Sequence, residues 1–145
     1  MISQRPTGVF DKKSSISNGE TIMATIPNYR QSERMRSDLS LLASHQYPQI
    51  KDWTGSSYTG RAISTWPARQ HAYELTHWDT LIARFVETPT GIALDYFDAT
   101  YHSVSTRAFQ GRILAAVADY PNIENTIRDE LAKPTQHRGI IRGQE

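Results

Sequence analysis

The sequence contains no cysteine, and this absence excludes disulfide scaffolds, thiolate zinc sites and cysteine nucleophiles together. Long hydrophobic runs are also missing: the longest covers residues 113–118, far short of the roughly 20 apolar residues that cross a bilayer. No apolar stretch typical of a secretory signal occurs near the N-terminus. We therefore expect a cytoplasmic protein that does not insert into a membrane.

An excess of charge of one sign is lacking as well. The 16 Lys and Arg residues nearly balance the 15 Asp and Glu residues, which leaves a net charge of +1. Such a balance gives no strong electrostatic attraction to nucleic acid or to an anionic membrane. A local excess of cations occurs in residues 1–36, where six basic residues face three acidic ones, and it is too small to change this expectation.

The chain is long enough for one small domain: it has 145 residues, of which 38% are hydrophobic. Residues 1–27 carry isolated apolar residues at no helical or strand period, which predicts a disordered N-terminal tail. Met23 is a second candidate start, because residues 19–22 can be encoded by a purine-rich stretch that resembles a bacterial ribosome-binding site. We expect a single α+β domain over residues 28–133 and a flexible, polar C-terminal tail over residues 134–145.

Three segments have the hydrophobic spacing of amphipathic helices. The first, 28–45, places Met35, Leu39 and Leu42 on one face. The second, 105–120, carries one continuous apolar stripe and ends before a proline. The third, 122–133, has an apolar residue at every fourth position. Gly111, inside the second helix, indicates a close approach of that helix to another element, or else a tolerated cost of up to ~1 kcal/mol.

Between the first two helices the hydrophobic period changes to two. This pattern, with its β-branched and aromatic residues, predicts strands over residues 60–65, 71–78, 81–87 and 92–98. The connections between them are short, which favours an antiparallel meander. We predict an α+β fold: a small three- to four-stranded antiparallel meander with the 105–120 helix packed across it and the other two helices flanking it.

The turn into the 105–120 helix holds the most suggestive polar cluster. A helix N-terminus presents unpaired N–H groups and a partial positive charge, so it suits an anion. Arg107 lies where a cation opposes the helix dipole by about 0.3–1 kcal/mol, so we expect Asp95, Asp98 or a bound anion to offset it. The alternative is a plain cap at Ser105 or Thr106 with a solvated Arg107. The predicted ligand-binding residues are His102, Ser103, Ser105, Thr106 and Arg107.

Aromatic residues interleaved with arginines form a second candidate surface. Trp, Tyr and Arg are the preferred anchors of protein interfaces, and the same side chains can stack on single-stranded bases. The alternative is that the large aromatic side chains build the core of a thin sheet. The predicted partner-binding residues are Trp53, Tyr58, Arg61, Trp66 and Arg69.

Metal binding and catalysis have less support in the sequence. His77 and Asp79 share a strand face if the strand continues through them, and His102 would complete a set of two histidines and one carboxylate. The sequence has no HExxH motif and no GxSxG nucleophile elbow. We therefore predict no catalytic residue, no metal and no cofactor.

The motifs YELTHWDTLIA (73–83), LDYF (94–97) and YHSVSTR (101–107) together resemble a domain of small uncharacterised bacteriophage proteins. In that family, paired strands lead into a Ser/Thr-rich turn and then a helix. The resemblance covers about residues 58–118. It implies a phage accessory protein that acts inside a bacterium, and it brings no catalytic residues.

Two classes of function remain open. The first is a non-enzymatic, phage-encoded binding protein that engages a host or phage protein in the bacterial cytoplasm. The second is a binder of nucleic acid or a phosphate ligand that uses the helix N-terminus at residues 103–107. The sequence predicts no membrane partner, and it does not indicate the oligomeric state.

Overall fold

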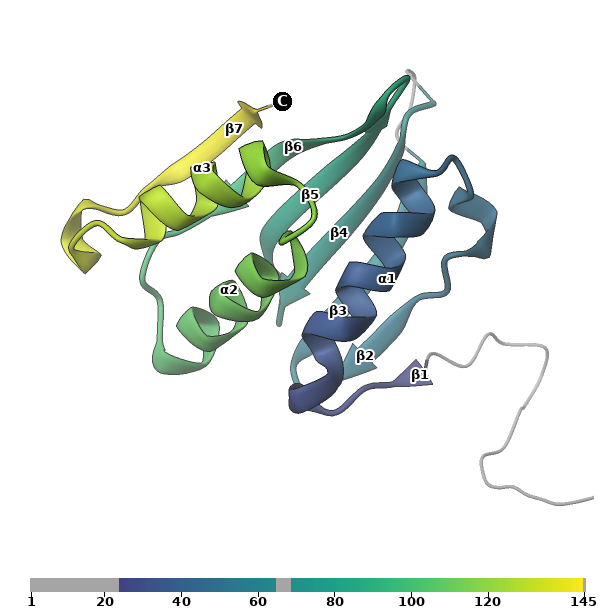
Figure 1. Cartoon of the computed structure of the whole chain (residues 1–145). Coiled ribbons are helices and arrows are strands. Elements are labelled where there is room, and N and C mark those ends of the chain that lie inside the picture. The colour runs from purple at the N-terminus through teal and green to yellow at the C-terminus, as the bar shows by residue number, and fades with distance from the viewer. Residues whose placement is uncertain (1–23, 65–68, 145) are drawn as a thin grey trace, which may run out of the picture.

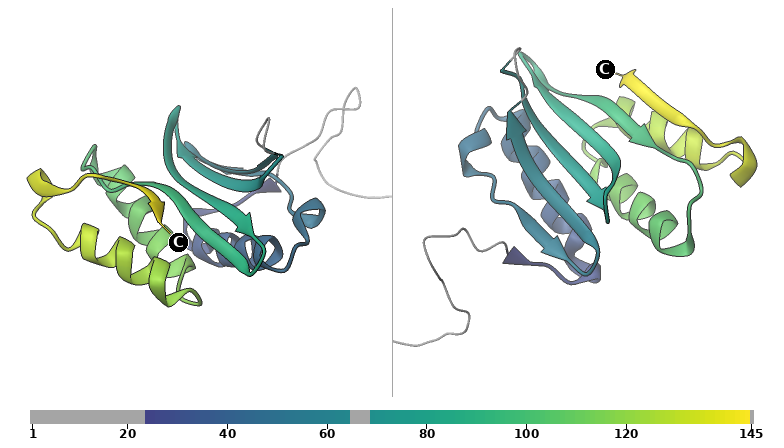
Figure 2. Two further views of the ribbon diagram at one scale, coloured as in Figure 1. Left: turned by 90° about the horizontal axis from the view of Figure 1, so that it is seen from above. Right: turned by 180° about the vertical axis from the view of Figure 1, so that it is seen from behind.

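The computed structural model describes residues 24–64 and 69–144. In this part of the chain a seven-stranded sheet, ordered β1-β2-β3-β4-β5-β6-β7, forms one layer. Three α-helices form a second layer, and all of them cover the same face of the sheet (Figures 1 and 2). The other face of the sheet carries no helix of the described residues.

The elements have the following bounds. The strands are β1 (Ala24–Thr25), β2 (Trp53–Gly55), β3 (Tyr58–Ser64), β4 (His71–His77), β5 (Thr80–Thr88), β6 (Gly91–Asp98) and β7 (Ile140–Gln144). The α-helices are α1 (Gln31–Ala43), α2 (Val104–Ala116) and α3 (Pro121–Leu131). Short 3-10 turns are η1 (Asn28–Arg30), η2 (Tyr47–Gln49) and η3 (Thr135–His137).

The predicted three- to four-stranded meander is wrong, because the sheet is larger and mixed. The four predicted strands are present as β3 to β6 and pair antiparallel in sequence order. β2 and β7 extend this meander by antiparallel pairing, while β1 pairs parallel with β2. No hydrophobic period predicts the added strands, because β1 and β2 have only two and three residues and β7 has two adjacent isoleucines without apolar alternation.

Both predicted tails contribute to the sheet. Residues 134–145 are not simply a polar tail, because β7 pairs antiparallel with β6 from Asp98↔Ile140 to Leu94↔Gln144. Ile141 packs against the core and gives this strand an apolar anchor. At the other end β1 lies inside the predicted tail of residues 1–27, whereas residues 1–23 lie outside the described part of the chain.

The helices bury the faces that their sequences predict. α1 buries Met35, Leu39 and Leu42 against β4, β5 and β6. α2 buries Phe109 and Ile113, and α3 buries two isoleucines four residues apart, Ile123 and Ile127. The predicted second helix is shorter than expected, because α2 ends at Ala116, four residues before the predicted end. Pro121 opens the predicted third helix as α3, where its missing N–H costs nothing.

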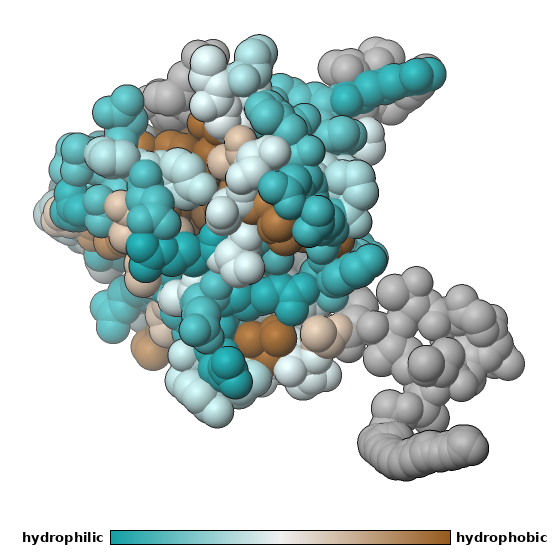
Figure 3. All heavy atoms as spheres, turned by 45° about the vertical axis from the view of Figure 1, so that its right-hand side comes forward, coloured by the Kyte–Doolittle hydropathy of each residue, from teal (hydrophilic) through white to brown (hydrophobic). Residues whose placement is uncertain are grey.

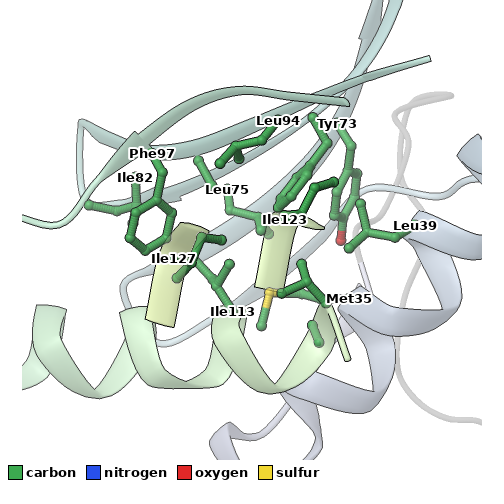
Figure 4. Close-up of a cluster of buried hydrophobic side chains, with 14 of the residues drawn as sticks. Met35, Leu39, Tyr73, Leu75, Ile82, Leu94, Phe97, Ile113, Ile123 and Ile127 are labelled. Carbon is green, nitrogen blue, oxygen red and sulfur yellow. The ribbon is translucent and has the colours of Figure 1, made fainter. Parts of the chain in front are cut away.

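The core lies between the helices and one face of the sheet. Figure 4 shows Leu75 and Phe97 of the sheet meeting Met35 and Ile113 of the helices. All four side chains are completely buried. On the surface drawn in Figure 3, by contrast, apolar residues form separate small patches among hydrophilic ones.

A chain of buried hydrogen bonds crosses this core. The indole Nε1 of Trp53 donates to Tyr73 Oη at 2.8 Å, and the Tyr73 hydroxyl donates to Asp38 Oδ2 at 2.6 Å. Arg34 Nε donates to the same carboxylate at 3.1 Å. Burial raises the pKa of both Asp38 and Tyr73, because the charged form of each loses its hydration. The network joins β2, β4 and α1.

Gly60 of β3 lies directly against this network. A Cβ at Gly60 would overlap the indole of Trp53 and lie 2.8 Å from Tyr73 Oη. Gly111 in α2 is different, because a Cβ there meets nothing within 4 Å. The expectation that Gly111 marks a close approach of its helix is therefore wrong, and its cost to the helix is simply tolerated.

We expect opposite effects when these two glycines are replaced by alanine. Gly60→Ala forces Trp53 or Tyr73 out of place and lowers the free energy of unfolding by about 1–3 kcal/mol. Gly111→Ala removes a flexible residue from a helix interior and raises it by up to ~1 kcal/mol. Urea unfolding of both variants tests this, and an unchanged Gly60→Ala midpoint would contradict the packing described for Gly60.

Candidate functional site

The structure describes four of the five predicted partner-binding residues and separates them into buried and exposed positions. Trp53 is fully buried and Tyr58 is 4% exposed, so these two residues belong to the core and cannot contact a partner. Arg61 and Arg69 are exposed, and Trp66 lies outside the described residues. Trp53 and Tyr58 therefore build the core, as the alternative interpretation of the aromatic residues predicts. A sheet with helices on one face needs large side chains to fill the space between the two layers.

The most exposed Trp of the described residues is Trp78, at 73%. It occupies a two-residue turn with Asp79 between β4 and β5, where His77 pairs with Thr80. Its φ of +55° lies in the left-handed region, which costs a bulky residue about 1–2 kcal/mol. Its backbone N–H donates to Ser57 O at 2.7 Å and so holds this turn beside the β2–β3 turn.

The exposure of Trp78 was not predicted, because the predicted strand 71–78 includes this residue. A large aromatic residue inside a predicted strand is expected to pack against the sheet, whereas a turn residue is expected at the surface. The signal was available: two apolar strands separated by two residues predict a hairpin, and the separating residues are Trp78 and Asp79.

Trp78 forms one wall of a hollow on the sheet face opposite the helices. The hollow has a volume of about 410 Å³, which is within the range of ligand pockets. β3 and β4 form its floor, where Arg61 pairs across the strands with Glu74 and the hydroxyls of Thr59 and Thr76 are hydrogen-bonded. The lining residues are Thr59, Arg61, Glu74, Thr76, Trp78 and Asp79.

Most charges around the hollow have partners. Glu74 Oε2 lies 2.6 Å from Arg84 Nη2, and the same arginine reaches Asp95 at 3.3 Å. Arg61 Nε lies 4.0 Å from Asp52 Oδ2, and 60% of the Arg61 side chain is exposed. Among the described residues of the predicted partner surface, Arg61 is the one that lines this hollow.

The predicted anion-binding residues do lie together, at the start of α2. Ser103 is the helix cap: its Oγ accepts from the Thr106 N–H at 3.1 Å, so the expected cap at Ser105 or Thr106 is wrong. The guanidinium of Arg107 lies 5.5 Å from the centre of the Tyr101 ring. A cation–π contact therefore partners Arg107.

His102, another predicted residue of this turn, also has an internal partner. His102 Nε2 lies 2.8 Å from Asp98 Oδ2, so Asp98 pairs with His102 and not with Arg107. Asp98 also accepts the Thr100 N–H at 2.9 Å. The first turn of α2 contains no acidic residue, so no side chain of that turn neutralises the partial positive charge of the helix N-terminus. Ser105 and Arg107 are exposed beside this N-terminus.

His77 joins the two candidate regions. Its Nδ1 lies 2.8 Å from Thr106 Oγ1 of α2, and its ring stacks on Tyr58 at 4.6 Å. The Trp78 turn and the start of α2 therefore lie at the same end of the molecule (Figure 1). Burial lowers the pKa of His77, and the nearby charges of Arg112 and His102 lower it further.

Over residues 24–64 and 69–144, no group of three or more histidine and acidic side chains is placed to hold a metal ion. The set of His77, Asp79 and His102 considered from the sequence therefore does not assemble. Nor is any helix in this part of the chain long and apolar enough to span a membrane.

No protein-family model matches the chain, and comparisons with curated proteins and with solved structures found no match either. The resemblance of residues 58–118 to a bacteriophage domain therefore stays a prediction.

We expect His77 to make the stability of the fold depend on pH. Because its pKa is lowered from the ordinary value of 6.5, the folded protein binds fewer protons than the unfolded chain below that pH. The stabilisation by neutral His77 is present above pH 6.5 and is lost as the pH falls through the lowered pKa. Urea unfolding between about pH 7.5 and about pH 5 measures this loss.

The matched variant for this measurement is His77→Asn, which keeps a polar side chain and cannot titrate. It should lose less unfolding free energy than the wild type over the same pH interval. Equal losses in the two proteins would show that other groups cause the dependence.

Proposed function

We propose that this protein is a non-enzymatic binding protein that holds a protein partner at the hollow around Trp78. The observation that carries the proposal is the 73% exposure of Trp78 in a left-handed backbone conformation. An indole in water adds little to the stability of its own fold, and Trp is enriched among the residues that dominate binding energy. Strained residues of this kind cluster at binding and catalytic sites.

The surroundings of Trp78 support an interface. Arg61 lies in the same hollow, and Arg is another residue favoured at binding surfaces. The threonines and carboxylates of the lining supply the polar groups that typically surround an aromatic anchor. The hydrogen bond from the Trp78 N–H to Ser57 O fixes the turn before binding, which reduces the entropy lost on association.

The class of partner follows from the resemblance over residues 58–118. On that basis we propose a host or phage protein, met in the bacterial cytoplasm. A catalytic role has little support at the α2 turn, because Ser103 Oγ contacts Thr106 and not His102. The proposal is therefore limited to binding.

The second candidate function is binding of nucleic acid or a phosphate ligand at the start of α2. It is favoured by one observation: Ser105 and Arg107 are exposed at a helix N-terminus whose first turn holds no acid. It is weakened because Ser103 and His102 have internal partners and Arg107 lies over Tyr101. The test below distinguishes the two functions.

We expect Trp78→Ala to lose the partner while the fold stays intact. The tagged full chain is used to recover partners from nuclease-treated bacterial lysate, and the proteins are identified by mass spectrometry. Loss of an anchor worth about 2 kcal/mol lowers affinity roughly 30-fold. The unfolding free energy should change by less than about 0.5 kcal/mol, because the side chain is exposed.

Tyr29→Ala is the matched control, since Tyr29 is 86% exposed and lies in η1, away from the hollow. It should recover the same partner as the wild type. Equal recovery with Trp78→Ala would contradict the proposal. A partner that is recovered from untreated lysate, and is lost both after nuclease treatment and with Arg107→Ala, would instead support the nucleic-acid function.

A further inference from the structure

We propose that the hollow around Trp78 takes the cationic side chain of a lysine or arginine from its protein partner. In this arrangement the cation lies against the indole of Trp78 and is neutralised by the carboxylate of Asp79. The inference rests on the proposed function, and it names the chemistry that the same site recognises.

The first argument is the local charge. Two arginines, Arg61 and Arg84, face four carboxylates at and beside the hollow, which leaves a local net charge of −2 although the chain as a whole carries +1. The four carboxylates belong to Asp52, Glu74, Asp79 and Asp95. The next arginine along this face, Arg142, lies over the ring of Tyr96 at the β7 side of the sheet. The hollow is therefore complementary to a cation.

The second argument concerns which carboxylate is available. Glu74 is held by Arg84, and Asp52 is the nearest acid to Arg61. Asp79 has neither an ion pair nor a side-chain hydrogen bond with any residue in the described ranges 24–64 and 69–144, and it is exposed. A partner cation can pair with Asp79 without breaking an existing contact.

The third argument is the position of the indole. Trp gives the strongest cation–π attraction of the aromatic side chains, and both Lys and Arg use it. Trp78 and Asp79 are the two residues of one tight turn, so the aromatic face and the carboxylate are presented together. This combination of π face and anion is how proteins neutralise and orient an ammonium or guanidinium group.

Other occupants fit the hollow less well. A phosphate or an acidic side chain would meet the local excess of carboxylates. A purely apolar anchor would remove water from Thr59, Thr76, Arg61 and Asp79 without offering them hydrogen bonds, which is unfavourable. Among the described lining residues, Trp78 is the one large apolar side chain.

The experiment is a titration of the isotope-labelled full chain followed by amide and indole NMR signals. The probes are the peptide acetyl-Gly-Gly-Arg-Gly-Gly-amide, its lysine counterpart, and a third peptide with citrulline, an uncharged isostere of arginine. The indole signal of Trp78 is identified by its loss in Trp78→Phe. We expect saturable shifts of this signal with arginine and lysine, and binding weaker by about fivefold or more with citrulline.

Asp79→Asn should weaken binding of the arginine peptide by about threefold to tenfold, because it removes the paired charge. Asp129→Asn is the matched control: Asp129 lies on the surface of α3, away from the hollow, and its replacement changes the net charge equally. The control should bind the peptide as the wild type does. Undisturbed amide signals outside the turn verify that both variants fold.

Three results would overturn the inference: equal shifts with citrulline and arginine, equal weakening by Asp79→Asn and Asp129→Asn, or no shift with any peptide. If the partner is nevertheless lost with Trp78→Ala, the proposed binding site stands and only the recognised group is wrong. If Trp78→Ala also keeps the partner, the proposed function fails with it.

Discussion

The hydrogen-bond chain from Trp53 through Tyr73 to Asp38 is the constraint on which the arrangement of the fold depends. It joins β2, β4 and α1, which are separate segments of the sequence, and its three side chains are buried. A buried donor or acceptor that loses its partner is costly, so a shift of α1 along the sheet or a slip of the β2–β3–β4 register is strongly disfavoured. Gly60 gives the indole the room it needs.

This constraint determines how Trp78 is presented. With β3 and β4 in register, Tyr58 pairs with His77, and the turn before Tyr58 meets the turn after His77 through the hydrogen bond from the Trp78 N–H to Ser57 O. On the helix side, His77 contacts Thr106 of α2. The turn is thus supported from both layers while its indole remains in water, which is how a rigid scaffold places a binding residue on a loop.

Local charge on the open face of the sheet differs from the charge of the whole chain. The near-neutral composition predicts no broad attraction for polyanions. Composition does not show which cations and carboxylates strand pairing brings together. Arg61, Glu74 and Arg84 come from three strands and become neighbours only through the register of β3, β4 and β5. The negative local charge of the hollow depends on that register, because directly paired residues of neighbouring strands lie on the same face of the sheet.

The sequence by itself determined the three helices and the four central strands, because their hydrophobic periods are local and long enough to recognise. It also identified the cluster at residues 102–107, whose members are close simply because they are consecutive. Only the tertiary structure decided that β1, β2 and β7 join the sheet, and that Trp53 and Tyr58 are buried while Trp78 is exposed. Residue type does not distinguish a buried Trp from an exposed one. The difference in exposure arises from strand pairing between separate segments of the chain, which no local sequence pattern encodes.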